Sequence, residues 1–110
     1  MQINLEEKDG LSILRMNGDI DISTSPQLKK SFDKMLSGRD RKVVINLKDV
    51  HYVDSSGLAT LVEIFKNLRV SGGKLKLTNL SAKVKGLFEI TKLDKLFDIL
   101  PEEKDAVDSF

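Results

Sequence analysis

The sequence contains no cysteine and no tryptophan, and it has only one histidine and one tyrosine. The absence of cysteine excludes disulfide bonds, thiolate catalysis and cysteine-based metal sites, and it is compatible with a reducing compartment. The single histidine, His51, likewise excludes metal sites that are built from several histidines. We therefore expect neither sulfur chemistry nor clustered imidazole ligands.

An excess of one charge is also missing. The chain has 18 basic and 17 acidic residues, which gives a net charge of +1. Nucleic-acid-binding proteins usually show a basic patch or stripe, often interleaved with aromatic residues, and aromatic residues make up only 5% of this chain. DNA and RNA are therefore not expected as direct partners.

Long apolar runs and a basic leader are absent as well. No apolar stretch reaches the roughly 18 residues that a membrane-spanning helix requires. The first ten residues, MQINLEEKDG, carry acids and a strand-like alternation, where a signal peptide would have a basic segment followed by an apolar run. We expect a cytoplasmic protein that is neither exported nor inserted in a membrane.

The chain is long enough for one domain over residues 1–110, with 40% hydrophobic and 32% charged residues to form a core and a soluble surface. INLE and LSILRMN, on either side of the turn KDG, predict a hairpin. Ser25 as a cap and Pro26 in the first turn predict a helix that ends near residues 37–40. Its apolar stripe consists of Leu28, Phe32, Met35 and Leu36.

The rest of the chain alternates between strand-like and helix-like segments. KVVINL (42–47) is typical of a central parallel strand that is covered on both faces. KLKLTN (74–79) predicts another strand and LFDIL (96–100) a short edge strand. Helices are expected from the segment DSSGL onward, from near Ser81, and from Pro101 through Val107. The alternation predicts an α/β fold with a mixed, mostly parallel sheet of four to five strands and flanking helices.

Two loops follow predicted strands of this sheet. GDID (18–21) follows the second strand, and KDVHYVDSSG (48–57) follows the central strand. Ligands and partners of such sheets meet the loops at the carboxyl ends of the strands. We therefore expect one end of the molecule to gather Asp19, Asp21, Asp54, Ser55 and Ser56.

The alternatives that involve catalysis or a bound group are weak. A serine nucleophile needs an adjacent base and usually an elbow such as G-x-S-x-G, and His51 next to DSSG does not make a convincing pair with Ser55. SGGKLKLTN lacks the phosphate-loop pattern and precedes a strand, so its glycines are better explained as a helix-ending turn. The loop aspartates match no cation-binding loop. We expect no catalytic residue, no metal and no cofactor.

The segment VDSSGL (53–58) has more polar residues than a helix start requires. One Ser, Thr, Asp or Asn is enough as a cap, and a glycine in a helix costs about 1 kcal/mol relative to alanine. A helix start favours an anion such as a phosphate, and Ser55 and Ser56 carry hydroxyls that a kinase could phosphorylate, with Gly57 leaving room for the kinase. From these residues alone, an over-capped helix is at least as good an interpretation as a phosphorylation site.

The residues YVDSSGLATLVEIFKNLRVSGGKLKLTNLSAKVKGLFEITKLDKLFDI (52–99) strongly resemble the bacterial anti-sigma-factor antagonists, the small STAS-domain proteins of sporulation and stress signalling. NGDIDISTSPQLKKSF (17–32) matches the same family, so the resemblance covers roughly residues 3 to 100. One departure is Ala59, where many members carry a second glycine.

The resemblance implies a partner-switching mechanism. The unphosphorylated protein would bind an anti-sigma factor that is also a serine kinase, and so release a sigma factor. Phosphorylation of Ser55 would break the complex, and a serine phosphatase would restore it. Partner binding would involve Asp21, Asp54, Ser55, Ser56 and Gly57.

We expect a monomer when free. The alternative is a STAS subunit or scaffold of another assembly, such as a lipid transporter or a signalling complex, without a phosphorylation switch.

Overall fold

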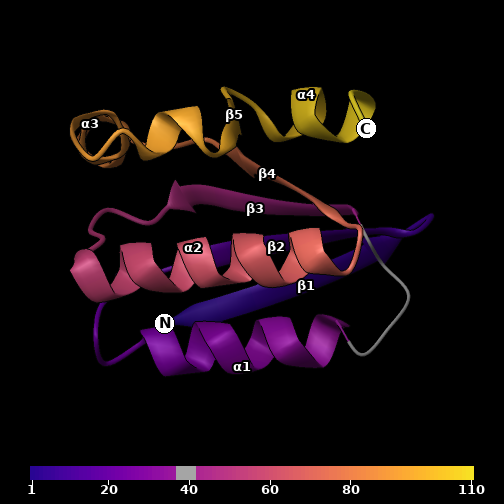
Figure 1. Ribbon diagram of the computed structural model, residues 1–110, viewed down its shortest axis with the longest axis horizontal. Helices are drawn as coiled ribbons and strands as arrows, with labels where there is room; N and C mark the ends of the chain where they lie inside the picture. The colour runs from indigo at the N-terminus through magenta and orange to yellow at the C-terminus, as the bar shows by residue number, and fades with distance from the viewer. Residues whose placement is uncertain (37–41) are drawn as a thin grey trace.

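A five-stranded sheet forms the centre of the molecule (Figure 1). The computed structural model describes residues 1–36 and 42–110. The strand order is β1-β2-β3-β4-β5, in which β1 and β2 are antiparallel and the other neighbours are parallel. The expected mixed, mostly parallel sheet is thus confirmed. The strands are β1 (Gln2–Lys8), β2 (Leu11–Asn17), β3 (Lys42–Asp49), β4 (Lys74–Thr78) and β5 (Asp98–Leu100).

Along the sequence, one helix follows each of the strands β2 to β5. They are α1 (Ser25–Leu36), α2 (Ser55–Val70), α3 (Ala82–Ile90) and α4 (Glu103–Asp108), with a short 3-10 turn, η1 (Leu93–Lys95), before β5. The expected end of α1 near residues 37–40 lies outside the described residues. The expected terminal helix is confirmed but begins two residues after Pro101.

The two faces of the sheet are covered unequally. Helices α1 and α2 lie on one face, where they enclose most of the buried apolar side chains together with α3 (Figure 1). On the other face, α4 covers a smaller cluster through Ala106, which packs against Leu11, Ile13 and Val44. Strand β3 is therefore buried on both faces, as its run of β-branched residues predicts.

The cap of α1 differs from the expectation. Ser25 belongs to the helix, and its hydroxyl oxygen is buried without a hydrogen-bond partner among the described residues. The preceding turn is held instead by Asp21 and Thr24: the amide of Asp21 donates to Thr24 Oγ1 at 2.9 Å, and the amide of Thr24 donates to Asp21 Oδ1 at 3.1 Å. The cap prediction was wrong because Ser25 points into the interior.

Candidate functional site

The two loops singled out from the sequence run side by side at the carboxyl ends of β2 and β3. Their backbones are joined by hydrogen bonds from Gly18 N to Asp49 O (3.1 Å), from Ile20 N to Tyr52 O (3.0 Å) and from Asp54 N to Ile20 O (3.1 Å). The loops thereby continue the pairing of β2 with β3 beyond the strands themselves. Parallel pairing brings the expected residues to one end of the molecule.

Asp54 joins both loops to the start of α2. It is the N-cap residue of that helix, and its Oδ1 accepts a hydrogen bond from the amide of Gly57 at 2.8 Å. Its Oδ2 accepts a second hydrogen bond from the amide of Ile22, in the other loop, at 3.1 Å. One carboxylate therefore satisfies a free amide of α2 and fixes the neighbouring loop against it.

Because Asp54 caps α2, neither Ser55 nor Ser56 is needed for capping. Ser55 is exposed and Ser56 is half-buried, and neither hydroxyl has a hydrogen-bond partner among the described residues. Ser56 therefore does not cap the helix. The hydroxyl of Ser55 faces solvent at the positive end of a helix of 16 residues.

Gly57 is buried where the first turn of α2 passes the other loop. A Cβ atom at this position would lie 2.3 Å from the carbonyl oxygen of Ile20 and 2.9 Å from Cγ1 of Val53. Both distances are too short for any side chain, so the fold itself requires glycine here. Direct contact of Gly57 with a partner stays a prediction.

Asp21 organises its own loop. Its Oδ1 accepts hydrogen bonds from the hydroxyl of Ser23 at 2.7 Å and from the amides of Ser23 and Thr24. These bonds, the Ser23 hydroxyl first, hold the pKa of Asp21 below its usual value. The side chain is therefore ionised at neutral pH and adds a negative charge to the loop that Asp54 holds against α2.

Exposed apolar side chains near this end were missed by the sequence analysis. Ile22, next to Asp21, is 73% exposed, Tyr52 is 45% exposed, and Ile90 of α3 is 82% exposed. A groove of about 330 Å³ separates the loop before Asp54 from α3, with the ammonium of Lys83 lying 5.7 Å from the centre of the Tyr52 ring. It is lined by His51, Tyr52, Val53, Ala82, Lys83, Val84, Gly86, Leu87 and Ile90. Two features of the sequence could have indicated these exposed side chains. Ile22 is an isoleucine in an otherwise polar loop, and Ile90 lies outside the apolar stripe of α3.

Two further findings bear on the chemistry of this end. Over residues 1–36 and 42–110, no group of three or more His, Asp or Glu side chains is placed to hold a metal ion. Within the same residues, no helix is both long enough and apolar enough to cross a bilayer.

Asp19 is exposed, and its backbone carbonyl, not its carboxylate, accepts a hydrogen bond from the Thr24 hydroxyl.

Comparison with known proteins gives consistent relatives. Residues 2–106 match the family model of the STAS domain. The anti-sigma-B factor antagonist of Bacillus subtilis is 36% identical, over 97% of this chain and 99% of that protein. The crystal structure of an anti-sigma factor antagonist from Mycobacterium paratuberculosis superposes with a TM-score of 0.88 at 26% identity, over 98% of this chain and 92% of that one. The Bacillus protein SpoIIAA in its phosphorylated form shares the fold, with a TM-score of 0.74 at 20% identity over 97% of each chain.

Proposed function

This chain belongs to the STAS-domain family and is related to anti-sigma-factor antagonists along nearly its whole length, and we propose that it is a phosphorylation-controlled member of that group. In its unphosphorylated form it binds an anti-sigma factor that is also a serine kinase, and a sigma factor is released. Phosphorylation of Ser55 by that kinase ends the binding. A serine phosphatase regenerates the active form.

The exposure of the hydroxyls supports Ser55 as the acceptor. Ser55 is exposed, whereas Ser56 is half-buried, and the cap hydrogen bond of α2 is already made by Asp54. Phosphorylation of Ser55 therefore removes no hydrogen bond on which the helix depends. We expect the domain to stay folded when the phosphoryl group is added.

The charges around Ser55 support a switch in binding. A phosphoserine adds a charge of about −1.5 to −2 at neutral pH. It would stand next to Asp54, in a region that also contains the ionised Asp21. The added charge would repel acidic groups of a partner and would disrupt a close, dry contact, although the helix N-terminus itself tolerates a phosphate.

The apolar side chains beside Ser55 support a protein as the partner. Ile22 and Tyr52 are exposed next to Asp21 and Asp54, and the groove along α3 adds Leu87 and Ile90. Exposed apolar groups that gather at one place usually mark an interaction surface. We therefore place the contact with the anti-sigma factor across the two loops, the start of α2 and this groove.

The chain acts as an acceptor of phosphate and as a binding protein in this proposal, not as an enzyme. Among the described residues, Ser55 has no hydrogen-bonded base, and His51 lines the groove instead. A serine hydrolase would need such a pair. We further propose that the free protein is a cytoplasmic monomer.

The observation that carries the proposal is the exposed, unbonded hydroxyl of Ser55 beside the capping carboxylate of Asp54, in a chain related to anti-sigma-factor antagonists throughout. The test is incubation of the purified chain with its cognate anti-sigma kinase and ATP, followed by mass spectrometry. One phosphate should be added to the wild type and to Ser56→Ala, and none to Ser55→Ala. Phosphate on the Ser55→Ala chain, or none on the wild type, would refute the mechanism.

A further inference from the structure

The pairing of β2 with β3 is irregular just before the two loops begin. Arg15 pairs with Asn46 and Asn17 pairs with Asp49, so that three steps along β3 correspond to two steps along β2. The extra residue of β3 is a bulge, and bulges bend a strand and redirect the side chains that follow. The bend lies directly upstream of the loop that leads to Ser55.

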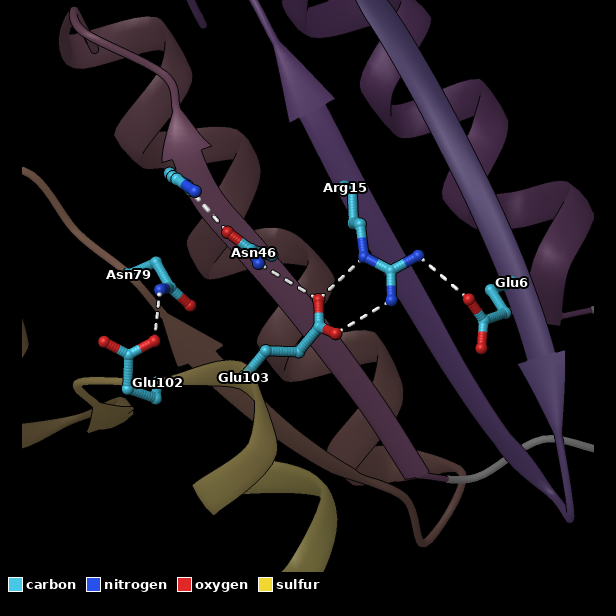
Figure 2. A network of polar contacts seen from close by, with 7 residues as sticks. Glu6, Arg15, Asn46, Asn79, Glu102 and Glu103 are labelled. Atoms are coloured by element: carbon cyan, nitrogen blue, oxygen red, sulfur yellow. Dashed lines mark hydrogen bonds and ion pairs between the residues drawn. The ribbon is translucent and has the colours of Figure 1, made fainter.

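The bulge is held by a side chain of β3 itself. Asn46 Oδ1 accepts a hydrogen bond from the amide of Lys48 at 2.8 Å. The amide nitrogen of the same side chain, Nδ2, donates to Glu103 Oε1 of α4 at 3.0 Å. Asn46 thus bonds to the backbone of the bulge on one side and to the C-terminal helix on the other, as Figure 2 shows.

Glu103 also binds the other strand of the irregular pair. Arg15 of β2 donates from Nε to Glu103 Oε1 and from Nη2 to Glu103 Oε2, both at 2.8 Å, and its Nη1 donates to Glu6 of β1 at 2.9 Å (Figure 2). A bidentate pair of this kind fixes direction as well as distance. A single carboxylate of α4 therefore holds Arg15 and Asn46, which face each other across β2 and β3 at the last regular position before the bulge.

The strands that Glu103 holds lead into the loops of the Ser55 site. Only a few residues separate Asn17 from Ile20, and Asp49 from Asp54, and the loops are joined by the three backbone hydrogen bonds described above. A change in the relative position of β2 and β3 at the bulge would shift these bonds. It would also shift the contact of Asp54 with Ile22.

From this geometry we infer that Glu103 is a positioning residue for the Ser55 site: through Arg15 and Asn46 it sets the bulge and the two loops, and so links docking of α4 to competence for the partner. The inference rests on the proposed function only where it concerns the partner. The coupling between α4 and the loops can be measured by itself.

The first experiment is amide hydrogen exchange, followed residue by residue by NMR, on the full chain and on Glu103→Ala. In the variant, local opening of the loops costs less free energy, because the charged hydrogen bonds of Glu103 no longer have to be broken. We therefore expect exchange about ten times faster at the amides of Gly18, Ile20, Lys48 and Asp54. The amide of Val44 in the core should change less than these. Asp105→Ala removes another acid from the first turn of the same helix, outside this network, and should leave the loop amides unchanged.

Asn46→Ala separates positioning of the loops from simple attachment of α4. In this variant Glu103 still binds Arg15, so the amides of α4 should keep most of their protection while Lys48, Ile20 and Asp54 lose theirs. Acceleration confined to α4 in Glu103→Ala, or a uniform acceleration that includes Val44, would overturn the inference. Unchanged loop amides in Asn46→Ala would do the same.

The second experiment is phosphorylation of the same variants by the cognate anti-sigma kinase. Glu103→Ala should raise KM about tenfold with little change in kcat, because the acceptor itself is intact and only its presentation changes. Wild-type kinetics for Glu103→Ala, with loosened loops, would refute the link to the partner. Failure of the kinase to modify the wild type would count against the proposed function alone, because the exchange data still test the coupling.

Discussion

The backbone of Gly57 passes so close to Ile20 that a Cβ atom on residue 57 would lie 2.3 Å from the Ile20 carbonyl oxygen. The same carbonyl accepts the hydrogen bond from the amide of Asp54 and cannot move without breaking it. The closeness of α2 to the neighbouring loop therefore depends on the absence of a side chain at this one position.

Gly57→Ala should destabilise the protein even though alanine is the better helix former. The gain in helix propensity is about 1 kcal/mol, whereas forcing an extra carbon into a packed contact costs about 1–3 kcal/mol. The obstacle is backbone, so it cannot be relieved by a change of rotamer. The cost should therefore lie in the upper part of that range, and we expect a net loss of about 1–2 kcal/mol, measured by chemical denaturation.

Gly86→Ala is the matched control for that substitution. Gly86 lies within α3, and a Cβ atom there would meet no atom within 4 Å. The same change should therefore stabilise the protein by about 0.5–1 kcal/mol through helix propensity alone. Equal shifts for the two variants would contradict the packing argument for Gly57.

Asp54→Ala should loosen two elements at once. It removes the cap of α2 and the bond that holds Ile22, and loss of an N-cap side chain typically costs about 1 kcal/mol. Hydrogen exchange should accelerate at the amides of both Gly57 and Ile22. Asp54→Asn keeps an oxygen acceptor and should preserve protection at Gly57, whereas equal exchange in all three proteins would show that the carboxylate holds neither element.

The elements of the fold follow from local patterns that the sequence displays. The run KVVINL became a strand buried on both faces, and Ser81 became the N-cap of α3, because alternation and capping act over a few residues. Ser25 was the exception. Serine is a residue type that often caps helices, but tertiary packing buries the Ser25 hydroxyl. Asp21 and Thr24 stabilise the turn before α1 instead.

The site was less accessible from the sequence, because its geometry depends on residues that are far apart in the chain. The pattern DSSG located Ser55 and Asp54 but could not show that Gly57 faces Ile20 or that Asp54 bonds to Ile22. The pairing of Arg15 with Glu103, 88 positions apart, has no local signature at all. Such contacts appear only when the topology is known.

The contribution of Glu103 to stability should depend on pH. Hydrogen bonds from Arg15, and next in importance from Asn46, hold the pKa of Glu103 below its usual value of 4.5. A depressed carboxylate pKa stabilises the folded state above the pKa of the unfolded chain, and this stability is lost as the pH falls through the folded pKa. The wild type should therefore exceed Glu103→Gln by about 1 kcal/mol at pH 7, a modest value because the pair is partly exposed.

That difference should shrink in denaturation experiments below about pH 4.5 and vanish once Glu103 is protonated. Glu102→Gln is the control, since among the described residues Glu102 accepts no hydrogen bond from Arg15 and instead accepts one from Nδ2 of Asn79. A constant difference between wild type and Glu103→Gln from pH 7 to pH 3 would show that charge plays no part in the contribution of Glu103.

Substitutions at Ser55 should separate the effect of charge from the effect of removing the hydroxyl. Ser55→Ala removes a group that makes no hydrogen bond among the described residues, so it should bind the cognate anti-sigma factor with nearly wild-type affinity. Ser55→Asp places a permanent negative charge beside Asp54 at the same exposed position, and its affinity should fall by about tenfold or more. Titration calorimetry of each purified variant with the purified anti-sigma factor measures both affinities.

Ser56→Asp tests whether position matters as well as charge. It adds the same charge one residue further along, at a half-buried position in the first turn of α2, where a helix start also tolerates an acid. If the partner contacts the exposed face that carries Ser55, this variant should weaken binding less than Ser55→Asp. Equal weakening would mean that the partner responds to the total charge of this end of the molecule, and the specific role of Ser55 would then depend on the kinase alone.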